Sequence, residues 1–273
     1  MRSASLLLIA VVACAHVQAE PSARIESVRI GEAVFELRYE AEDAQAANQV
    51  REALRRAVPA AERWGRLSGP IVVTIHPTHG SLENTAHRSG YAWLRAWTRY
   101  GSIDLQSPRT WSRGKATDGE MAELLSHEIT HCVMYRSAAS ESTWQHVRIP
   151  LWFREGMATV TAGERKRVGP PEIRRFYQEA TTSPAAGDPL SRPEPLYKSN
   201  SELVYGTAHS AFQFLLDRYG EDRIRRLLPA MAEGSDFASA FQLSMGISVE
   251  EFEREFRHYV LWQGGLALHV RGT

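Results

Sequence analysis

The segment His127-Glu128-Ile129-Thr130-His131 restricts this 273-residue chain more than any other feature of its sequence. In an α-helix, residues four positions apart lie on the same face, one turn above each other. If the segment is helical, both imidazoles point to a common place, and Glu128 lies beside the first. Two such histidines can bind one metal ion, and the neighbouring carboxylate can accept a proton from water. The alternative is that two surface or core histidines happen to be four residues apart.

The flanking residues favour the helix. Thr117 and Glu120 form a capping box, the pattern in which two side chains satisfy the first backbone amides of a helix. Apolar residues then recur at Met121, Leu124, Leu125, Cys132 and Val133. We therefore expect a helix that runs to about Met134, and a second helix from Pro150 to about Val160.

Glu155 is the expected third metal ligand. It follows His131 by 24 residues and lies in the second expected helix. Catalytic zinc takes three protein ligands and keeps one open position, and two histidines with a glutamate are a known set. Gly156 would allow the two helices to approach closely. The alternative is an exposed carboxylate at the start of a helix, where the dipole favours it.

Together, the two segments carry a resemblance to a known family. The pattern His127-Glu-Ile-Thr-His131, followed by Pro150-x-Trp152-x-x-Glu155-Gly156-x-Ala158, resembles the gluzincins, and most of all the peptidase MA-like family of bacterial envelope proteins. It is also similar to the thermolysin-like aminopeptidases. The resemblance covers most of residues 20–273 and implies a zincin-like, zinc-dependent peptidase domain. It implies no particular substrate.

The same resemblance suggests a role for Tyr205. The pattern Tyr205-x-x-Ala208-x-x-Ala211-Phe212 is similar to a helix of those aminopeptidases in which a tyrosine hydroxyl stabilises the oxyanion. The chain departs from that pattern at Gly206-Thr207-Ala208, where a Lys-Gly pair would be expected. The alternative is a core tyrosine with a hydrogen-bonded hydroxyl. His209, one turn further on, is the second candidate donor.

The rest of the chain predicts one α+β unit, with a small N-terminal mixed sheet and a mostly helical C-terminal half. Strands are expected within 23–41, at 71–75 and at 100–107, a helix at 43–64, and irregular structure at 76–97. Further helices are expected after Pro170-Pro171, from Ser199-x-x-Glu202 to Gly220, and from Ser248-x-x-Glu251 to about Trp262. Residues 181–198 predict a long loop.

The first nineteen residues predict an export signal. Arg2 precedes a short apolar run at 6–12, and Val17-Gln18-Ala19 fits a cleavage site. Alternatively, the residues before Cys14 resemble a lipobox, and a lipidated Cys14 would anchor the chain to a membrane. A buried N-terminal strand is a third interpretation. We expect an exported chain, periplasmic or secreted, with or without the lipid anchor.

Composition limits the classes of partner. The chain has 32 Lys and Arg and 32 Asp and Glu, and this balance argues against nucleic-acid binding. With Cys14 removed or lipidated, Cys132 has no partner for a disulfide. His76 and His79 flank Pro77, which excludes a shared helix, so we interpret them as the end of a strand.

The expected function is therefore zinc-dependent hydrolysis of peptide bonds. His127, His131 and Glu155 would bind Zn²⁺, Glu128 would act as general base, and an extended peptide or protein substrate would pair with the strand Ser102–Gln106. An endopeptidase is favoured over an aminopeptidase, because we find no acidic anchor for a substrate amine. The alternatives are an inactive, zinc-binding envelope module and an interaction protein without metal. The sequence does not indicate the oligomeric state.

Overall fold

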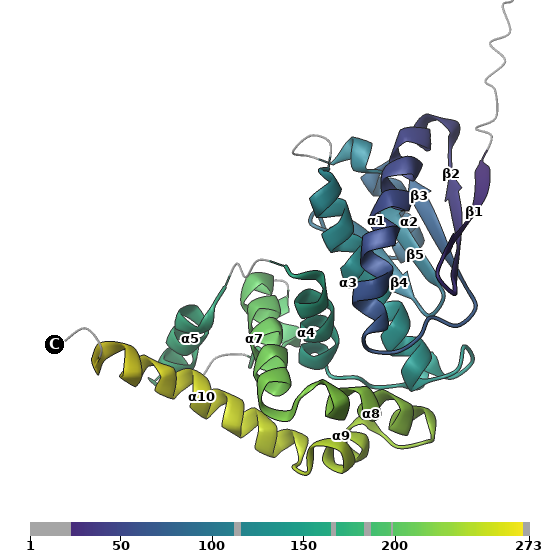
Figure 1. Cartoon of the computed structure of the whole chain (residues 1–273). Helices are drawn as coiled ribbons and strands as arrows, with labels where there is room; N and C mark the ends of the chain where they lie inside the picture. Colours follow the sequence, from purple (N-terminus) through teal and green to yellow (C-terminus); the bar gives the residue numbers. More distant parts are fainter. Residues whose placement is uncertain (1–22, 112–115, 165–167, 183–186, 198, 270–273) are drawn as a thin grey trace, which may run out of the picture.

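The computed structural model describes residues 23–111, 116–164, 168–182, 187–197 and 199–269. The expected export signal with Cys14 lies outside these ranges. The N-terminal part forms a strand-rich lobe and the C-terminal part a helical lobe (Figure 1). Its elements are β1 (Arg24–Ile30), β2 (Ala33–Tyr39), α1 (Ala44–Glu62), β3 (Pro70–His76), α2 (His79–Ala86), β4 (Ala96–Arg99) and β5 (Ser102–Gln106), followed by α3 (Asp118–Ala138), α4 (Leu151–Ala162), α5 (Pro170–Thr182), α6 (Glu194–Tyr197), α7 (Ser201–Tyr219), α8 (Glu221–Ala232), α9 (Phe237–Met245) and α10 (Val249–His269). The α+β class predicted from the sequence is confirmed.

The five strands form one mixed sheet in the order β1-β2-β3-β5-β4. The pairs β2–β3 and β3–β5 are parallel, and the pairs β1–β2 and β4–β5 are antiparallel. The expectation that a substrate would pair with Ser102–Gln106 is therefore wrong, because β5 already has a partner strand on each side. The edge next to it is β4, which pairs Ala96 with Leu105 and Arg99 with Ser102.

The sequence predicts irregular structure throughout 76–97, but the structure has α2 and the start of β4 there. Thr78 caps α2, since its hydroxyl accepts a hydrogen bond from the backbone N–H of Ser81 at 3.1 Å. The helix is only eight residues long and weakly apolar, and β4 has only four residues. Elements this short show too few periods of hydrophobic alternation to be recognised in sequence.

One face of the sheet supplies the core of the strand-rich lobe. Alternate residues of the inner strands are fully buried, as the period of two requires: Phe35, Leu37, Ile71, Val73, Ile103 and Leu105. They belong to one hydrophobic cluster with the buried residues of α1 and α3. In α1 the buried face includes the apolar residues Val50, Leu54, Ala57, Val58 and Ala61. This packing holds α3 against the sheet.

Capping residues define the ends of the long helices. In α3 the expected box is present: the backbone N–H of Glu120 donates to Thr117 Oγ1 at 3.2 Å, and that of Thr117 donates to Glu120 Oε2 at 2.8 Å. Ser248 caps α10 as expected, accepting from the backbone N–H of Glu251. In α7 the cap is Asn200 and not the expected Ser199, because Asn200 Oδ1 lies 3.3 Å from the backbone N of Leu203.

The helical lobe is built around α4. Trp152 is completely buried and stacks on Phe252 of α10, with ring centroids 4.9 Å apart. Phe153 packs edge-on against Phe212 of α7 at 5.4 Å.

None of the helices in the described ranges combines the length and apolar character that crossing a bilayer requires.

Candidate metal centre

The helix α3 places the two motif histidines on one face. The Nε2 atoms of His127 and His131 lie 3.1 Å apart, and their rings meet nearly edge to face with centroids 4.8 Å apart. Both residues fall in the interior of a 21-residue helix, about two turns or more from either end. The spacing of four residues therefore brings the two nitrogens together, as the sequence predicted.

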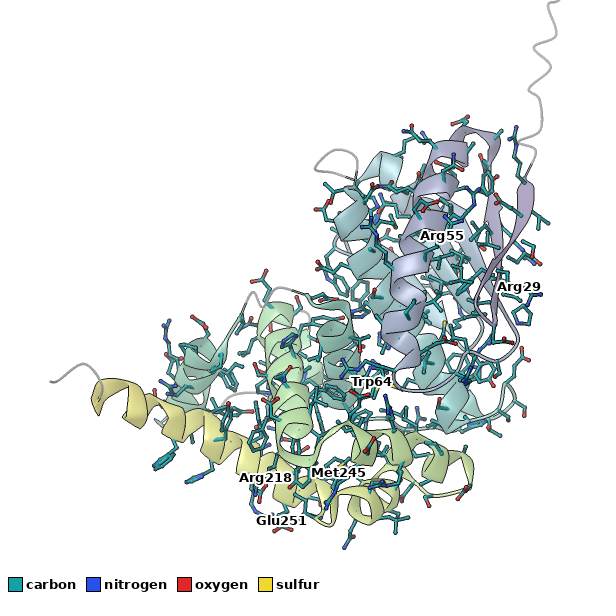
Figure 2. The ribbon with its side chains drawn as sticks, viewed as in Figure 1. Arg29, Arg55, Trp64, Arg218, Met245 and Glu251 are labelled. Carbon is teal, nitrogen blue, oxygen red and sulfur yellow. The ribbon has the colours of Figure 1, made fainter. Side chains whose placement is uncertain are left out.

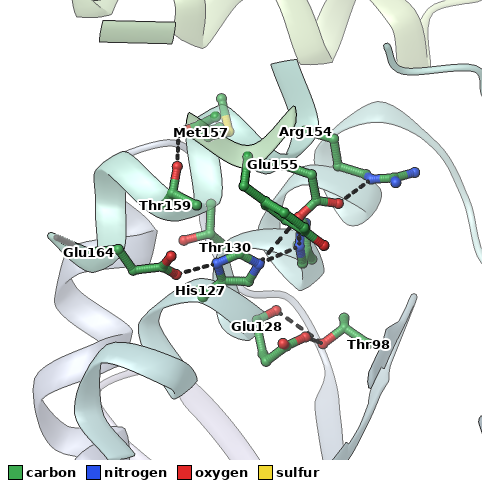
Figure 3. Close-up of polar contacts among 12 residues, drawn as sticks. Thr98, His127, Glu128, Thr130, Arg154, Glu155, Met157, Thr159 and Glu164 are labelled. Carbon is green, nitrogen blue, oxygen red and sulfur yellow. Dashed lines mark hydrogen bonds and ion pairs between the residues drawn. The ribbon is translucent and has the colours of Figure 1, made fainter. Parts of the chain in front are cut away.

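Helix α4 brings Glu155 to the same place (Figure 3). Glu155 Oε2 lies 3.4 Å from His127 Nε2 and 3.6 Å from His131 Nε2. Glu155 is buried, and its other oxygen, Oε1, accepts a hydrogen bond from Arg154 Nε at 3.0 Å. The two carboxylate oxygens thus have different neighbours: Oε2 faces the imidazoles and Oε1 faces a guanidinium.

The donor set fits a zinc ion. In a tetrahedral site with bonds of about 2.0–2.1 Å, two ligand atoms are separated by about 3.3 Å. The three observed separations, 3.1, 3.4 and 3.6 Å, lie around that value. Two imidazoles and one carboxylate are also a ligand set that zinc accepts while keeping an open position. The residues present therefore match the group that the sequence implied.

The buried carboxylate of Glu155 requires a positive charge beside it. Burial alone would lower the pKa of His127, but its hydrogen bonds to Glu155 and Glu164 hold that pKa well above its usual value. Burial alone would raise the pKa of Glu155, but the neighbouring His131 and His127 hold it well below its usual value. Without a metal, an imidazolium supplies the positive charge that this buried carboxylate requires.

Glu164 contributes to the site by contacting His127, and the sequence analysis did not identify it. Its Oε1 lies 2.6 Å from Nδ1 of His127, on the side of the ring away from Nε2. Gly163, with φ of 68°, ends α4 in the left-handed conformation and turns the chain back toward α3. Metal-binding histidines usually donate their second ring N–H to such a carboxylate. Only the Gly at the end of the helix hinted at this turn.

Glu128 is held by the edge strand. Thr98 of β4 donates its hydroxyl to Glu128 Oε2 at 2.6 Å, and both side chains are buried (Figure 3). The contact joins the sheet to the histidine helix beside the three donor atoms. Thr98 was not identified from the sequence, because it lies in a segment that showed no strand pattern.

Tyr205 lies on α7 and meets Tyr197, with their hydroxyl oxygens 2.8 Å apart. Burial, and after it the charge of Glu155, raises the pKa of Tyr205 well above its usual value, so the hydroxyl keeps its proton. The rings of Tyr197 and Tyr205 each lie 6.2 Å from the ring of Trp93. The second candidate, His209, lies one turn further along α7 and interacts electrostatically with Glu164.

The residues set aside from the site have neighbours away from the three donor atoms. His76 Nε2 lies 2.8 Å from Asp104 Oδ1, and His79 Nδ1 lies 3.1 Å from Gln106 Oε1. Cys132 is completely buried, and this burial raises the pKa of its thiol to about 12. It acts as a small apolar residue of the core.

Gly156 permits a close helix contact, although not the expected one. A Cβ built at this position would lie 2.6 Å from Phe212 Cβ and would overlap the carbonyl oxygen of Ala208. Both belong to α7. The glycine therefore brings α4 onto α7 rather than onto the histidine helix.

Comparison with known proteins gives limited similarity. No family model matches the chain. The protein YhcO of Bacillus subtilis is 26% identical over 137 residues, which are 49% of this chain and 39% of that protein. The crystal structure of Legionella pneumophila aminopeptidase A, in complex with aspartic acid, matches with a TM-score of 0.53 and 15% identity over 86% of this chain and 28% of that one.

A second solved structure, an M1 zinc metallopeptidase from Deinococcus radiodurans, matches with a TM-score of 0.42 and 13% identity over 87% of this chain and 51% of that one. The chain thus spans less than half of the curated relative and less than a third of the Legionella structure. The Legionella match shows a shared fold with part of an aminopeptidase.

Proposed function

We propose that this chain is a zinc-dependent metallopeptidase with a zincin-like fold, in which His127, His131 and Glu155 hold the ion. The observation that carries the proposal is the convergence of three donor atoms, from two helices, at separations that fit one tetrahedral cation. The likeness in fold to part of an aminopeptidase is consistent with it. When bound, zinc would polarise the substrate carbonyl and make water more acidic.

Glu128 is the proposed general base. It would take a proton from the attacking water and pass it to the leaving nitrogen, so that hydrolysis yields a carboxylate and an amine. Its hydrogen bond from Thr98 leaves Oε1 available while fixing the side chain. A base so placed also disfavours the alternative of an inactive zinc-binding module, since such a module has no need for it.

Tyr205 is the proposed donor to the oxyanion. Either of the hydroxyls of Tyr197 and Tyr205 can be the donor in their mutual hydrogen bond. If Tyr197 donates, the proton of Tyr205 is free to point to a substrate oxygen. Such a donor contributes about 3 kcal/mol to stabilisation of a transition state.

The substrate is proposed to pair with β4. This strand is the edge of the sheet next to Glu128, and among the described strands it pairs only with β5. An extended peptide that adds to β4 would pass beside Thr98 and the base. This assignment replaces the one made to Ser102–Gln106.

The test combines metal content with turnover. Purified protein should contain about one zinc per chain and hydrolyse a mixture of peptides, and a chelator should abolish the hydrolysis until zinc is restored. Glu128→Gln should keep the zinc and lose the turnover, because the amide cannot accept the proton. Protein that takes up zinc without hydrolysing any peptide would support the inactive module. Protein that takes up none would end the proposal.

We also propose that the chain acts outside the cytoplasm, on the basis of residues 1–19 alone. Mass spectrometry of the mature N-terminus distinguishes the two export routes. A chain that begins at Glu20 indicates signal cleavage, and a lipidated Cys14 indicates an anchored lipoprotein. An unprocessed chain would contradict export.

A further inference from the structure

A pocket next to the metal centre is rich in positive charge. It has a volume of about 380 Å³ and opens at the N-terminal end of α4, with Arg148, Pro150, Arg154 and Glu194 in its lining. The lining therefore includes two guanidinium groups and one carboxylate. The backbone adds to this balance, because Pro150 at the helix N-cap provides no side-chain acceptor for the first amides of α4.

Arg154 joins this pocket to the metal centre. Its Nε donates to Glu155 Oε1, while Glu155 Oε2 faces the two imidazoles (Figure 3). One of the five N–H groups of the guanidinium is thus used, and the side chain is 32% exposed. The other N–H groups form no hydrogen bond within the part of the chain that the structure describes. The guanidinium and the two imidazoles thus contact different oxygens of the same Glu155 carboxylate.

Arg148 is the second cation of the pocket. It is exposed, and among the described residues it has neither an ion-pair partner nor a hydrogen-bond partner. Some other arginines are engaged: Arg136, for example, donates to the carbonyl oxygens of Tyr100 and Pro70. A guanidinium is best matched by a planar anion with two oxygens.

We infer that this pocket binds a carboxylate of the peptide substrate close to the scissile bond. The inference rests on the proposed function, because that function brings a peptide to Glu155. A peptide offers carboxylates from two sources, its C-terminal end and the side chains of Asp and Glu. Both have the planar pair of oxygens that Arg148 and Arg154 can hold.

Binding to an inactive chain tests this inference. Short peptides would be prepared as the free C-terminal acid, as the C-terminal amide, and as the amide with Glu in place of an internal Gln. Their dissociation constants for zinc-loaded Glu128→Gln would be measured by calorimetry. We expect at least one of the charged forms to bind about tenfold or more tightly than the neutral amide. The form that gains the affinity identifies the source of the carboxylate.

Two matched variants assign the effect to the pocket. Arg148→Gln should remove most of the preference for the charged peptide. Arg29→Gln, which makes the same change of net charge on the exposed side of β1 at the far edge of the sheet, should keep it (Figure 2). Equal affinity for charged and neutral peptides, or the same loss in both variants, would overturn the inference.

The outcome is separable from that of the proposed function. If the parent chain hydrolyses no peptide but the charged forms bind preferentially, the carboxylate pocket stands and the peptidase proposal fails. The parent chain could instead hydrolyse charged and neutral peptides equally well, while the inactive variant binds them with equal affinity. The peptidase proposal then stands and the pocket inference fails.

Discussion

At the scale of single residues, the metal centre depends on side chains whose two polar atoms have different partners. Glu155 uses one oxygen toward the imidazoles and the other toward Arg154. His127 turns Nε2 inward and Nδ1 toward Glu164. In a buried site each unpaired polar atom is costly, so these outer partners determine how the inner atoms are oriented.

Thr98 is expected to position Glu128, the proposed general base. Thr98→Val removes the hydroxyl that donates to Glu128 Oε2 at 2.6 Å while keeping the shape of the side chain. We expect kcat to fall between about tenfold and a hundredfold, because a displaced base loses its alignment with the water. KM and zinc content should change little. Thr98→Ser, which keeps the hydroxyl, should restore most of kcat, and a failure to do so would indicate a purely structural role.

Glu164 is expected to control affinity for zinc. Glu164→Gln weakens the acceptor that lies 2.6 Å from His127 Nδ1. Loss of such an outer partner typically lowers metal affinity by about ten- to a hundredfold. Competition with a chelator of known affinity measures this effect. Glu141→Gln, at an exposed position in a turn, is the matched control and should leave the affinity unchanged. Equal affinities in both variants would contradict the role.

At the scale of elements, the site depends on how α4 is held between its neighbours. Its Glu155 must reach α3, while Gly156, the next residue, lies against α7. The backbone of α7 at Ala208 leaves no room for a side chain there. The depth at which α4 sits, and so the reach of Glu155, is fixed by this contact.

Gly156→Ala should therefore destabilise the fold. The new methyl group would overlap the Ala208 carbonyl and lie 2.6 Å from Phe212 Cβ, so α4 and α7 must separate. We expect a loss of about 1–3 kcal/mol, or several degrees in Tm. Thermal unfolding measures this loss. Gly80→Ala, in a helix where nothing lies within 4 Å, should not lower Tm, because alanine favours a helix. Equal Tm values for the two variants would show that α4 and α7 can adjust.

At the scale of the whole molecule, a long-range ion pair ties the connection between α5 and α7 to the last helix. Asp188 accepts hydrogen bonds from the backbone N–H groups of Leu190 and Ser191, each at 2.9 Å, and from Arg257 of α10 at 3.2 Å. This contact joins residues 69 positions apart. It anchors part of the segment 181–198, for which the sequence predicts a long loop, although α6 forms within it.

Asp188 should make stability depend on pH in the acid range. Burial alone would raise its pKa, but the backbone hydrogen bonds and the charge of Arg257 hold it below its usual value of 3.8. The ionised group therefore stabilises the fold at neutral pH, and this contribution is lost as the pH falls below about 4. Asp188→Asn should be less stable than the parent by about 1–3 kcal/mol at pH 7, with a smaller difference at pH 3.

Urea unfolding at the two pH values, with EDTA present so that metal release makes no contribution, measures the effect. Asp222→Asn is the control, because its side chain is 85% exposed. A difference from the parent that stayed constant between pH 7 and pH 3 would rule out ionisation of Asp188 as the source of the stability.

The sequence alone predicted the features whose cause is local in the chain. The spacing of His127 and His131 predicted their common face, and Thr117 with Glu120 predicted the start of α3. The tertiary structure decided the features that depend on segments far apart in the chain: the pairing that makes β4 the edge, the reach of Thr98 to Glu128, the turn of Glu164 onto His127, and the contact of Gly156 with α7. Helical periodicity depends on residues that are close in the sequence, whereas contacts between distant segments depend on how whole elements pack.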